Sequence, residues 1–595
     1  MFESLLIANR GEIAVRVARS ARRMGIATVA VYSDADRDAP HVRAADSAVH
    51  IGPASPRESY LNIAAILKAD AEAVHPGYGF LSENPAFAEA VIASGRVWVG
   101  PPPAAMRALG DKANAKKLAA AAGVPVLPTY ERKPGFPLVI KAVAGGGGRG
   151  MRLVRSAGEL DEALASAKSE AEHAFGDERV ILERAILAPR HVEVQIFADA
   201  KGNCVHLGER DCSVQRRHQK LIEESPSPAV DAKLRAKLGE AAVAVACAAG
   251  YVGAGTIEFL IDEAGAFWFI EANARLQVEH PVTEMVTGLD LVEWQLRVAA
   301  GEPLPRAQKD IRFDGHAIEA RLCAEDPVRN FLPQAGRLVL WQPAPGVRVD
   351  HALESGIEIP PHYDSLAAKL IAHGRTRDEA REKLATALDA TVALGIPTNK
   401  AFLAAVLRDP VFAGPGATTA LLEERFASWG APQPDESVAR ALYAAASARA
   451  ASYGEWSAWT NMARATLESA PGAATWTALR NAHPPSAPFA LEGPLLHFQL
   501  GGHCYSWRDT TMDPPQRVAA GLADGCLAAP MNGRVVAVHA KPGERIEAGR
   551  ALVVLEAMKM EHTLAAPAAL RVKAVHVAKG AQVAPGKLLM EFEPA

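Results

Sequence analysis

The chain has 595 residues, of which 49% are hydrophobic and 22% are charged, and its 64 basic and 68 acidic residues give a net charge of -4. This balance provides no broad basic surface, so neither nucleic acid nor a membrane is expected as a partner. At roughly 100 to 200 residues per domain, the length predicts about four domains. Residues 1–8 run directly into an apolar segment without a signal peptide, and no apolar run reaches the roughly 18 residues of a membrane helix, which predicts a cytoplasmic protein.

The N-terminal segment has the pattern of a βαβ unit. Residues 5–9 and 27–32 are apolar and predict strands, and the apolar residues of 11–24 have helical spacing. This pattern favours a doubly wound α/β sheet, although the segment lacks the glycine fingerprint of a dinucleotide site. The glycine-rich loop at 75–84 follows another apolar segment, at the strand end where such sheets bind ligands.

A glycine run separates two apolar segments, and it includes Gly145, Gly146, Gly147 and Gly148. Alone, such a run is equally typical of a flexible linker. Between two strands, its bare amides can fold over phosphate groups, with Lys141 as a positive charge at the base of the loop. It is not a Walker A loop, because no Gly-Lys-Ser/Thr sequence follows it.

Two apolar segments, 255–260 and 267–273, carry acidic and amide residues. Glu271 and Asn273 are two positions apart, which places them on one face of a strand, and Glu258 can meet them from the neighbouring strand. Solvent-facing acids on an edge strand are the alternative for either segment alone. Hard oxygen ligands beside a phosphate loop suit magnesium, so the combination favours a metal site.

The segment directly after these strands alternates in the same way. Arg275, Gln277 and Glu279 each lie two positions apart. An alternating pattern places an anion donor, an amide and a carboxylate on one side of the chain.

The C-terminal segment is a repeat with an offset of 37 positions. Gly543 corresponds to Gly580, for example, and Gly549 to Gly586. Each half alternates apolar and polar residues at strand period, which predicts an all-β flattened barrel of two similar halves. Lys559 lies between the halves in a Met-Lys-Met sequence, at the tip of a strand-turn-strand, where a two-residue turn would normally favour Asn-Gly or Asp-Gly.

These patterns resemble a known family. The Glu-Ala-Met-Lys-Met sequence around Lys559, with its double repeat, is similar to the biotin carboxyl carrier domain, whereas the related lipoyl domains usually have Asp-Lys-Ala there. Residues 1–430 are similar to biotin carboxylase of the ATP-grasp superfamily, although the stretch between Tyr130 and Gly135 is shorter than in that family. The similarity is carried by residues 7–13, 75–80, 110–112, 145–150, 209–213, 215–220, 277–281 and 324–327. The chain as a whole resembles the biotin-containing α subunit of an acyl-CoA carboxylase, most like the methylcrotonoyl-CoA or geranyl-CoA type.

The resemblance implies a multidomain protein. Its expected parts are an N-terminal α/β biotin carboxylase domain at 1–112, an ATP-grasp domain at 113–310, a biotin carboxylase C-terminal domain at 311–430, a transferase-contacting middle domain with a linker at 431–523, and a biotin carboxyl carrier domain of biotinyl/lipoyl type at 524–595. The middle domain is expected to be mixed α+β, with a helix at 440–451 and strands at 495–500 and 504–507. Residues 509–524 lack a helix or strand pattern and predict a linker.

The resemblance also implies ATP-dependent carboxylation of biotin by bicarbonate and assigns residues to it. Lys112, Lys141 and the amides of Gly145, Gly146, Gly147 and Gly148 would hold phosphates, and Glu258, Glu271 and Asn273 would hold Mg²⁺ or Mn²⁺. Glu183, His191, Gln215 and His218 would line the nucleotide pocket, with Lys220 as a further charge near the phosphates. Arg275 and Gln277 would bind bicarbonate, Glu279 would be the general base, Arg321 would stabilise the enolate of biotin, and Lys559 would carry the biotin.

The chain has too few residues to include a carboxyltransferase, and this predicts a partner subunit. Roughly 90 residues between the carboxylase and the carrier are too few for a carboxyltransferase, so a separate carboxyltransferase β subunit is expected in a hetero-oligomer. A biotin protein ligase would attach the biotin. Because the absent subunit chooses the acyl substrate, α subunits of geranyl-, propionyl- or acetyl-CoA carboxylases, or a pyruvate enzyme, remain alternatives. A biotin carrier scaffold with an inactive ATP-grasp half is the alternative from another class, and the intact set of carboxylates argues against it.

Overall fold

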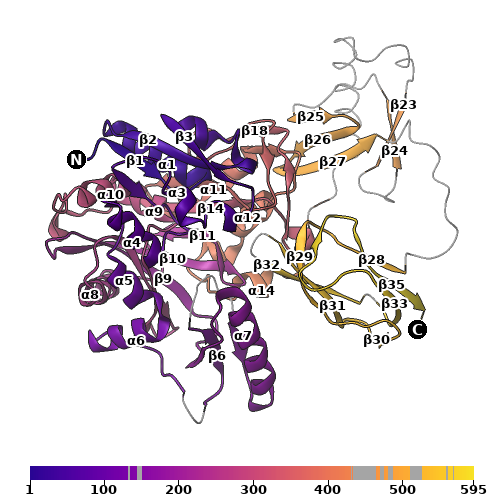
Figure 1. Cartoon of the computed structure of the whole chain (residues 1–595), viewed down its shortest axis with the longest axis horizontal. Helices are drawn as coiled ribbons and strands as arrows, with labels where there is room; N and C mark the ends of the chain where they lie inside the picture. The colour runs from indigo at the N-terminus through magenta and orange to yellow at the C-terminus, as the bar shows by residue number, and fades with distance from the viewer. Residues whose placement is uncertain are drawn as a thin grey trace.

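The computed structural model of the chain describes residues 1–130, 134–143, 151–430, 432, 464–468, 475–479, 487–509, 525–557, 560–566 and 568–594. Residues 1–430, indigo to orange in Figure 1, form one large body, and the yellow C-terminal β-domain lies beside it. Several predicted features lie outside the described residues: Gly145 to Gly148, the trimmed stretch at 131–133, the helix at 440–451, the linker at 510–524, and Lys559.

The N-terminal segment forms the predicted doubly wound α/β sheet. Its five parallel strands lie in the order β3-β2-β1-β4-β5. The side-chain amide of Asn9, just beyond β1, donates to the carbonyls of Pro76 and Tyr78 at 2.7 and 2.8 Å, which fixes the glycine-rich loop at the carboxyl edge of the sheet. The elements are β1 Ser4–Ile7, α1 Gly11–Arg23, β2 Ala27–Ser33, α2 Pro40–Ala44, β3 Ser47–Gly52, α3 Ile63–Ile66, β4 Ala73–His75, α4 Pro85–Ala93, β5 Val97–Trp98 and α5 Pro103–Gly110.

The next segment consists of a small sheet and most of a large one. The small antiparallel sheet has the order β7-β6-β8 and packs against α7. The predicted strands on either side of the glycine run are confirmed as β6 and β7. The elements are α6 Lys112–Ala121, β6 Leu138–Ala142, β7 Arg152–Val154, α7 Leu160–Phe175, β8 Val180–Arg184, β9 Arg190–Ala198, β10 Cys204–Arg216, β11 Gln219–Ser225, α8 Ala232–Ala248, β12 Gly253–Ile261, β13 Phe267–Asn273, α9 His280–Thr287 and α10 Leu291–Ala299.

The large sheet is antiparallel, with the order β13-β12-β9-β10-β11-β14-β21-β19. Its last three strands follow residue 310, so the sheet continues across the boundary predicted between the ATP-grasp and C-terminal domains. The C-terminal elements are β14 His316–Cys323, β15 Glu325–Asp326, β16 Leu332–Pro333, β17 Gly336–Arg337, β18 Leu340–Gln342, β19 Arg348–His351, β20 Glu358–Ile359, β21 Leu366–Gly374, α11 Arg377–Ala390, β22 Val392–Leu394, α12 Lys400–Arg408, α13 Pro410–Ala413 and α14 Leu421–Arg425.

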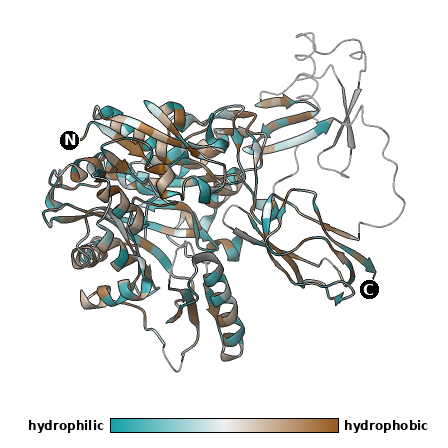
Figure 2. Ribbon diagram, viewed as in Figure 1, coloured by the Kyte–Doolittle hydropathy of each residue, from teal (hydrophilic) through white to brown (hydrophobic). Residues whose placement is uncertain are grey.

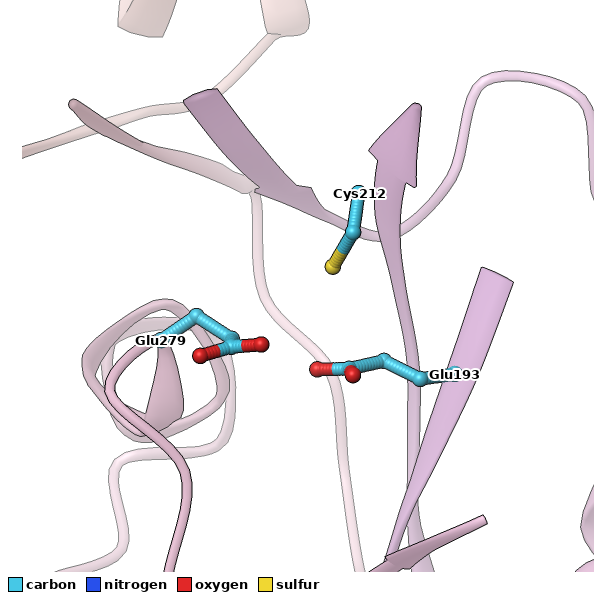
Figure 3. A group of neighbouring side chains, drawn as sticks. All are labelled: Glu193, Cys212 and Glu279. Carbon is cyan, nitrogen blue, oxygen red and sulfur yellow. The ribbon is translucent and has the colours of Figure 1, made fainter. Parts of the chain in front are cut away.

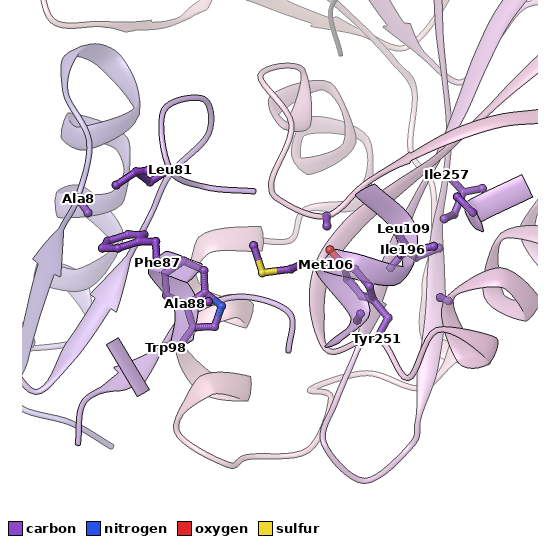
Figure 4. Packing of buried hydrophobic residues seen from close by; sticks show 14 of the residues in the cluster. Ala8, Leu81, Phe87, Ala88, Trp98, Met106, Leu109, Ile196, Tyr251 and Ile257 are labelled. Atoms are coloured by element: carbon purple, nitrogen blue, oxygen red, sulfur yellow. The ribbon is translucent and has the colours of Figure 1, made fainter. Parts of the chain in front are cut away.

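One apolar core joins the N-terminal sheet to the large sheet. Met106 of α5 lies between Phe87 and Trp98 on one side and Ile196 and Tyr251 on the other (Figure 4). All five side chains are at most 8% exposed. Because protein interiors are close-packed, this contact holds the glycine-rich loop of the first sheet in a fixed place relative to the second.

Five strands precede the C-terminal β-domain, and two of them, β26 and β27, pack on β22 and α12 of the large body. The five strands are β23 Arg464–Glu468, β24 Thr475–Leu479, β25 Phe489–Glu492, β26 Leu495–Leu500 and β27 His503–Asp509, in the sheet order β24-β23-β27-β26-β25. The strands predicted at 495–500 and 504–507 are confirmed as β26 and β27. Gln499 anchors β26, because it accepts from the Lys400 ammonium at 3.1 Å and donates to the Asp389 carbonyl at 2.6 Å.

The C-terminal domain is the predicted all-β structure, and its repeat is visible in its strands. Two four-stranded sheets have the orders β28-β35-β33-β30 and β32-β31-β29-β34. The strands are β28 Cys526–Ala528, β29 Gly533–Val538, β30 Arg545–Ile546, β31 Ala551–Ala557, β32 Met560–Ala565, β33 Leu570–Val575, β34 Gln582–Val583 and β35 Leu588–Pro594. β33, β34 and β35 begin 37 residues after β29, β30 and β31 respectively, which matches the sequence repeat.

Alternation along these strands builds the carrier core. Brown and teal residues succeed one another along the strands in Figure 2, and the brown set includes Val535, Leu552, Leu555 and Leu589, each fully buried. β31 and β32 pair antiparallel up to Ala557 opposite Met560. Among the helices in the described parts of the chain, none combines the length and apolar character needed to cross a bilayer.

Candidate active site

Lys220 of β11 lies at the centre of a buried group of carboxylates. Its Nζ atom is 2.6 Å from Glu193, 2.9 Å from Glu258 and 2.7 Å from Glu279. The three carboxylates are at most 3% exposed. Burial alone would lower the pKa of Lys220, but the charges of these carboxylates raise it well above its ordinary value. Lys220 is therefore a permanent positive charge in the middle of the large sheet.

The register of the large sheet brings these residues together. Glu193 of β9 lies directly opposite Glu258 of β12, and Lys220 lies opposite Gln215 on β10. The Lys220 side chain thus reaches past β10 to the two strands beyond it. Glu279 approaches from the residue before α9, and Figure 3 shows its carboxylate facing that of Glu193.

Two arginines complete the charge balance. Arg210, which is fully buried, donates to Glu193 at 2.5 Å through Nε, and its other nitrogens reach Gln195, Thr256 and Thr283. Arg321 of β14 donates to the second oxygen of Glu279 at 2.9 Å. Burial would raise the pKa of Glu279, but Lys220 and Arg321 hold it well below its ordinary value. Glu279 is therefore ionised and held between two cations.

A second carboxyl pair lies behind Arg321. Glu223 of β11 accepts from Arg321 Nε at 2.5 Å and is the direct cross-strand neighbour of Glu319 on β14. Neither carboxyl oxygen of Glu319 has a hydrogen-bond partner among the described residues. Burial raises the pKa of Glu223 to about 7 and that of Glu319 well above its usual range. Because two buried carboxyl groups this close cannot both ionise readily, the pair holds a proton near neutral pH.

The predicted anion-binding residues converge, although their backbone differs from the prediction. β13 ends at Asn273, and the chain then turns into α9 instead of staying extended, so strand alternation was the wrong basis. Arg275 nevertheless donates to Gln277 at 2.6 Å, and Gln277 donates to Glu258 at 3.2 Å. Arg275 also bonds Glu83 in the glycine-rich loop at 3.1 Å. The turn directs these side chains toward the Lys220 cluster.

The predicted metal ligands form a group of oxygens at the edge of the cluster. Glu258 and Glu271 are cross-strand neighbours, and the Asn273 amide lies 2.7 Å from Glu258. His191 lies 2.7 Å from the other oxygen of Glu258, and Lys112 lies 3.6 Å from Glu271. Hard oxygen donors from two adjacent strands fit a magnesium ion, with Glu271 partly open toward solvent.

A different group of side chains also meets the distance criterion for a metal. One atom each of Glu193, Cys212 and Glu279 lies within 4.8 Å of the others. Figure 3 shows these three side chains pointing toward a common space. Lys220, Arg210 and Arg321 already pair with the two carboxylates there. Burial raises the pKa of the Cys212 thiol well above its ordinary value, so the sulfur is protonated and a poor ligand. The Glu258 group is the better fit for a cation.

Two lysines and a glutamate lie below the glycine run. Lys141 of β6 and Lys116 of α6 are 2.7 and 2.6 Å from the two oxygens of Glu183 on β8. Burial would raise the pKa of Glu183, but the two ammonium groups lower it. His218, in the β10–β11 turn, has a pKa lowered by burial and by nearby Lys141. With Glu183 ionised, the two lysines leave one net positive charge among these residues, which suits an anionic ligand.

Models of known protein families match four parts of the chain. Residues 1–106 match the biotin carboxylase N-terminal domain, 111–307 the carbamoyl-phosphate synthase L chain ATP-binding domain, 319–424 the biotin carboxylase C-terminal domain, and 526–592 the biotin-requiring enzymes. A biotin carboxylase of Nostoc is 49% identical over 442 residues, which cover 71% of this chain and 99% of the relative. The chain belongs to the biotin carboxylase family. The match at 526–592 adds a biotin-attachment domain to the carboxylase.

Other biotin carboxylase relatives are longer. The mitochondrial methylcrotonoyl-CoA carboxylase subunit alpha of rice is 51% identical over 422 residues, covering 67% of this chain but only 57% of the rice protein. The Dictyostelium discoideum protein of the same name is 39% identical over 638 residues, covering 94% of this chain and 91% of that protein.

A solved structure has a similar carboxylase part. The biotin carboxylase domain of Hydrogenobacter thermophilus 2-oxoglutarate carboxylase, in complex with MgADP, ADP and bicarbonate, is 42% identical with a TM-score of 0.70. It covers 73% of this chain and 100% of that domain. The predicted family and fold class are confirmed.

Sequence reasoning missed several residues of the cluster. Glu193 and Gln195 alternate with the apolar residues Val192, Val194 and Ile196 of β9, a signal that could have been read as inward-facing polar groups. Arg210 and Glu319 gave no comparable signal, because a charged residue in a strand is more often exposed. Only the cross-strand register reveals their partners.

Replacing Arg210 by Met is expected to destabilise the chain by about 3 to 5 kcal/mol, because Glu193 loses one of its two cations while staying buried. The double variant Arg210→Met/Glu193→Gln should recover part of this loss. Denaturant unfolding of the full chain measures both, with exposed Arg57→Met as a control expected within about 0.5 kcal/mol of wild type. A single variant as stable as the control would contradict this account of the cluster.

Proposed function

We propose that this biotin carboxylase uses ATP and bicarbonate to carboxylate biotin on its own Lys559, as the α subunit of an acyl-CoA carboxylase of the methylcrotonoyl-CoA type. The observation that carries the proposal is Glu279, a buried, ionised carboxylate clamped between Lys220 and Arg321. A base and two anion-stabilising cations at one point are what deprotonation beside a phosphoryl transfer requires.

Bicarbonate is a poor electrophile, so its activation needs a phosphoryl group from ATP. Lys112, Lys141 and the amides of Gly145 to Gly148 would hold the phosphates, and Glu183, His191, Gln215 and His218 would line the nucleotide pocket. Glu258, Glu271 and Asn273 would hold Mg²⁺ or Mn²⁺, which supplies charge neutralisation on the phosphates when bound. The cationic surroundings of Glu183 support this assignment.

Glu279 needs a change of partners to act as a base. Two cations that lower the pKa of Glu279 also make it a weak proton acceptor. An entering phosphate would compete for the Lys220 ammonium, and losing that partner would raise the pKa of Glu279. Arg275 and Gln277 would hold bicarbonate beside it, so that binding of both substrates switches the base on.

Arg321 would act on biotin, which accepts the carboxyl group. It would stabilise the negative charge that develops on the biotin ureido oxygen when the adjacent nitrogen loses its proton. Its second bond, to Glu223, holds the guanidinium in place while Glu279 changes partners. A biotin protein ligase would attach the biotin beforehand.

The proposed acyl substrate and partner subunit are inferred from the similarity of this chain to its relatives in length and sequence. The Dictyostelium relative spans nearly the whole chain, which supports a methylcrotonoyl-CoA type enzyme with a separate carboxyltransferase β subunit. Geranyl-, propionyl- and acetyl-CoA carboxylases are the alternatives, because the β subunit would choose the substrate. The cytoplasmic location stays a prediction, since the rice and Dictyostelium relatives are named as mitochondrial.

Lys559→Arg should abolish biotinylation, because arginine offers no amine that can form the amide. Streptavidin blotting of the full chain measures this, and Lys541→Arg, at an exposed lysine of the same domain, is the matched control. Streptavidin binding by the Lys559 variant would show that the biotin is elsewhere.

Glu279→Gln should lower bicarbonate-dependent ATP hydrolysis about 10²- to 10⁴-fold, the usual effect of losing a positioned base. Nucleotide binding, measured by calorimetry, should persist because the phosphate-binding lysines are intact. The control is Glu263→Gln at an exposed position. A Glu279 variant with the control's hydrolysis rate would remove this residue from the mechanism.

The purified chain should transfer label from bicarbonate to its own biotin but not to methylcrotonoyl-CoA. Adding the carboxyltransferase β subunit should bring label into the acyl-CoA, and a panel of acyl-CoAs identifies the preferred one. Labelled acyl-CoA formed without the partner would overturn the two-subunit proposal.

A further inference from the structure

The carrier domain touches the carboxylase at a small apolar contact. Leu332, the first residue of β16, packs with Met531 and Ala557 of the carrier, and these side chains are 9%, 6% and 7% exposed. Met531 precedes β29, and Ala557 ends β31. In Figure 1 the β29 and β32 side of the yellow domain faces the carboxylase body. The contact therefore involves the tip region of the carrier.

The carboxylase loop that carries Leu332 has an unusual backbone. Asn330 and Phe331 have φ angles of 54° and 59°, a region that residues with a side chain rarely adopt. Such a conformation persists only where surrounding contacts hold it, and it is most frequent at functional sites. Two consecutive residues in this region turn the chain sharply just before Leu332.

Arg216 and Phe402 hold this loop from the carboxylase side. The Arg216 guanidinium donates to the Asn330 carbonyl at 2.7 Å and lies 4.3 Å from the centre of the Phe331 ring. The other edge of Phe331 meets the buried Phe402 ring at a centroid distance of 4.8 Å. The loop is therefore formed by the carboxylase itself and presents Leu332 to the carrier.

The same hairpin connects the contact to the active site. Arg216 ends β10, and Lys220 lies four residues farther on, in β11. Arg217 is also near the carrier: burial, followed by the charges of Arg217 and Arg216, lowers the pKa of His562 on β32 to about 4. His562 is therefore uncharged near neutral pH and adds no positive charge beside the two arginines.

We infer that Leu332, Met531 and Ala557 form the docking contact through which the carboxylase recognises its own carrier, with the loop of Asn330, Phe331 and Leu332 as a preformed platform. This inference rests on the proposed role of Lys559. Lys559 is two residues from Ala557, which is at most about 7 Å of extended chain, so a contact at Ala557 fixes the position of the biotin-bearing residue.

The small apolar area of this contact suits a carrier domain that binds the carboxylase only transiently. Three apolar side chains bury far less surface than a stable protein interface needs. The tether supplies a high local concentration, so a weak contact is enough to orient the tip while it is docked. Docking accordingly affects the tethered biotin and not free biotin, which needs no carrier to reach the site.

The test replaces Leu332 by Ser in the full biotinylated chain and compares two rates. Single-turnover transfer of label from bicarbonate to the chain's own biotin should fall about tenfold or more, the equilibrium effect expected for one lost leucine contact. ATP-dependent carboxylation of saturating free biotin should stay within about twofold of wild type. The matched control is Val328→Ser, a similar substitution four residues away at a side chain that is 58% exposed.

Met531→Ser tests the carrier side of the same contact, after streptavidin blotting has verified equal biotinylation. Its loss should equal that of Leu332→Ser, and the double variant should lose little more than either alone, because residues in contact are not additive. If the loss of transfer rate in the double variant instead equals the product of the two single losses, Leu332 and Met531 act independently. That result would contradict a shared docking contact.

Different results would contradict the docking contact and the proposed carboxylase function. A Leu332→Ser chain with an unchanged tethered rate would overturn the docking contact. Equal losses with free and tethered biotin would also overturn it, since Leu332 would then support the carboxylase site and not docking. A wild-type chain that carboxylates neither free nor tethered biotin would instead overturn the proposed function.

Discussion

Lys220 is buried with three glutamates, and its Nζ atom lies 2.6 to 2.9 Å from a carboxylate oxygen of each. Buried charges are stable only with partners and further hydrogen bonds. Arg210 supplies these for Glu193, Arg321 for Glu279 and His191 for Glu258. The cluster is therefore a preformed set of cations, and under the proposed function the oxygens of anionic substrates would take the place of some of their carboxylate partners.

The continuous eight-stranded sheet is what allows this exchange without loss of the fold. Its strands carry Glu193, Arg210, Lys220, Glu258 and Arg321 at fixed registers, while Glu279 comes from the turn before α9. A carboxylate on a turn can move by small backbone changes, whereas strand residues are held by the ladder on both sides. The predicted base thus lies outside the strand ladder that holds the other charged residues.

The sequence predicted elements whose pattern is local and missed partners that depend on register. The 37-residue repeat and its alternation located the carrier strands, because strand period follows directly from which face is buried. Arg275, Gln277 and Glu279 were expected to converge from an extended strand, but a turn brings them together, since alternation in sequence does not distinguish the two. Glu319 was missed altogether, because its significance lies in facing Glu223 across two strands distant in sequence.

The carboxylase and its carrier need opposite kinds of contact. The Lys220 cluster has many buried charge-assisted bonds, so it is costly to disassemble and remains ordered between turnovers. Among the described residues, the apolar carrier contact joins Met531 and Ala557 to Leu332, on a loop that Arg216 and Phe402 hold in shape. Because that loop is ordered by the carboxylase alone, docking does not have to order it, and a small apolar area suffices to orient the tip. A larger contact would hold the carrier at the first active site and slow its departure to a second.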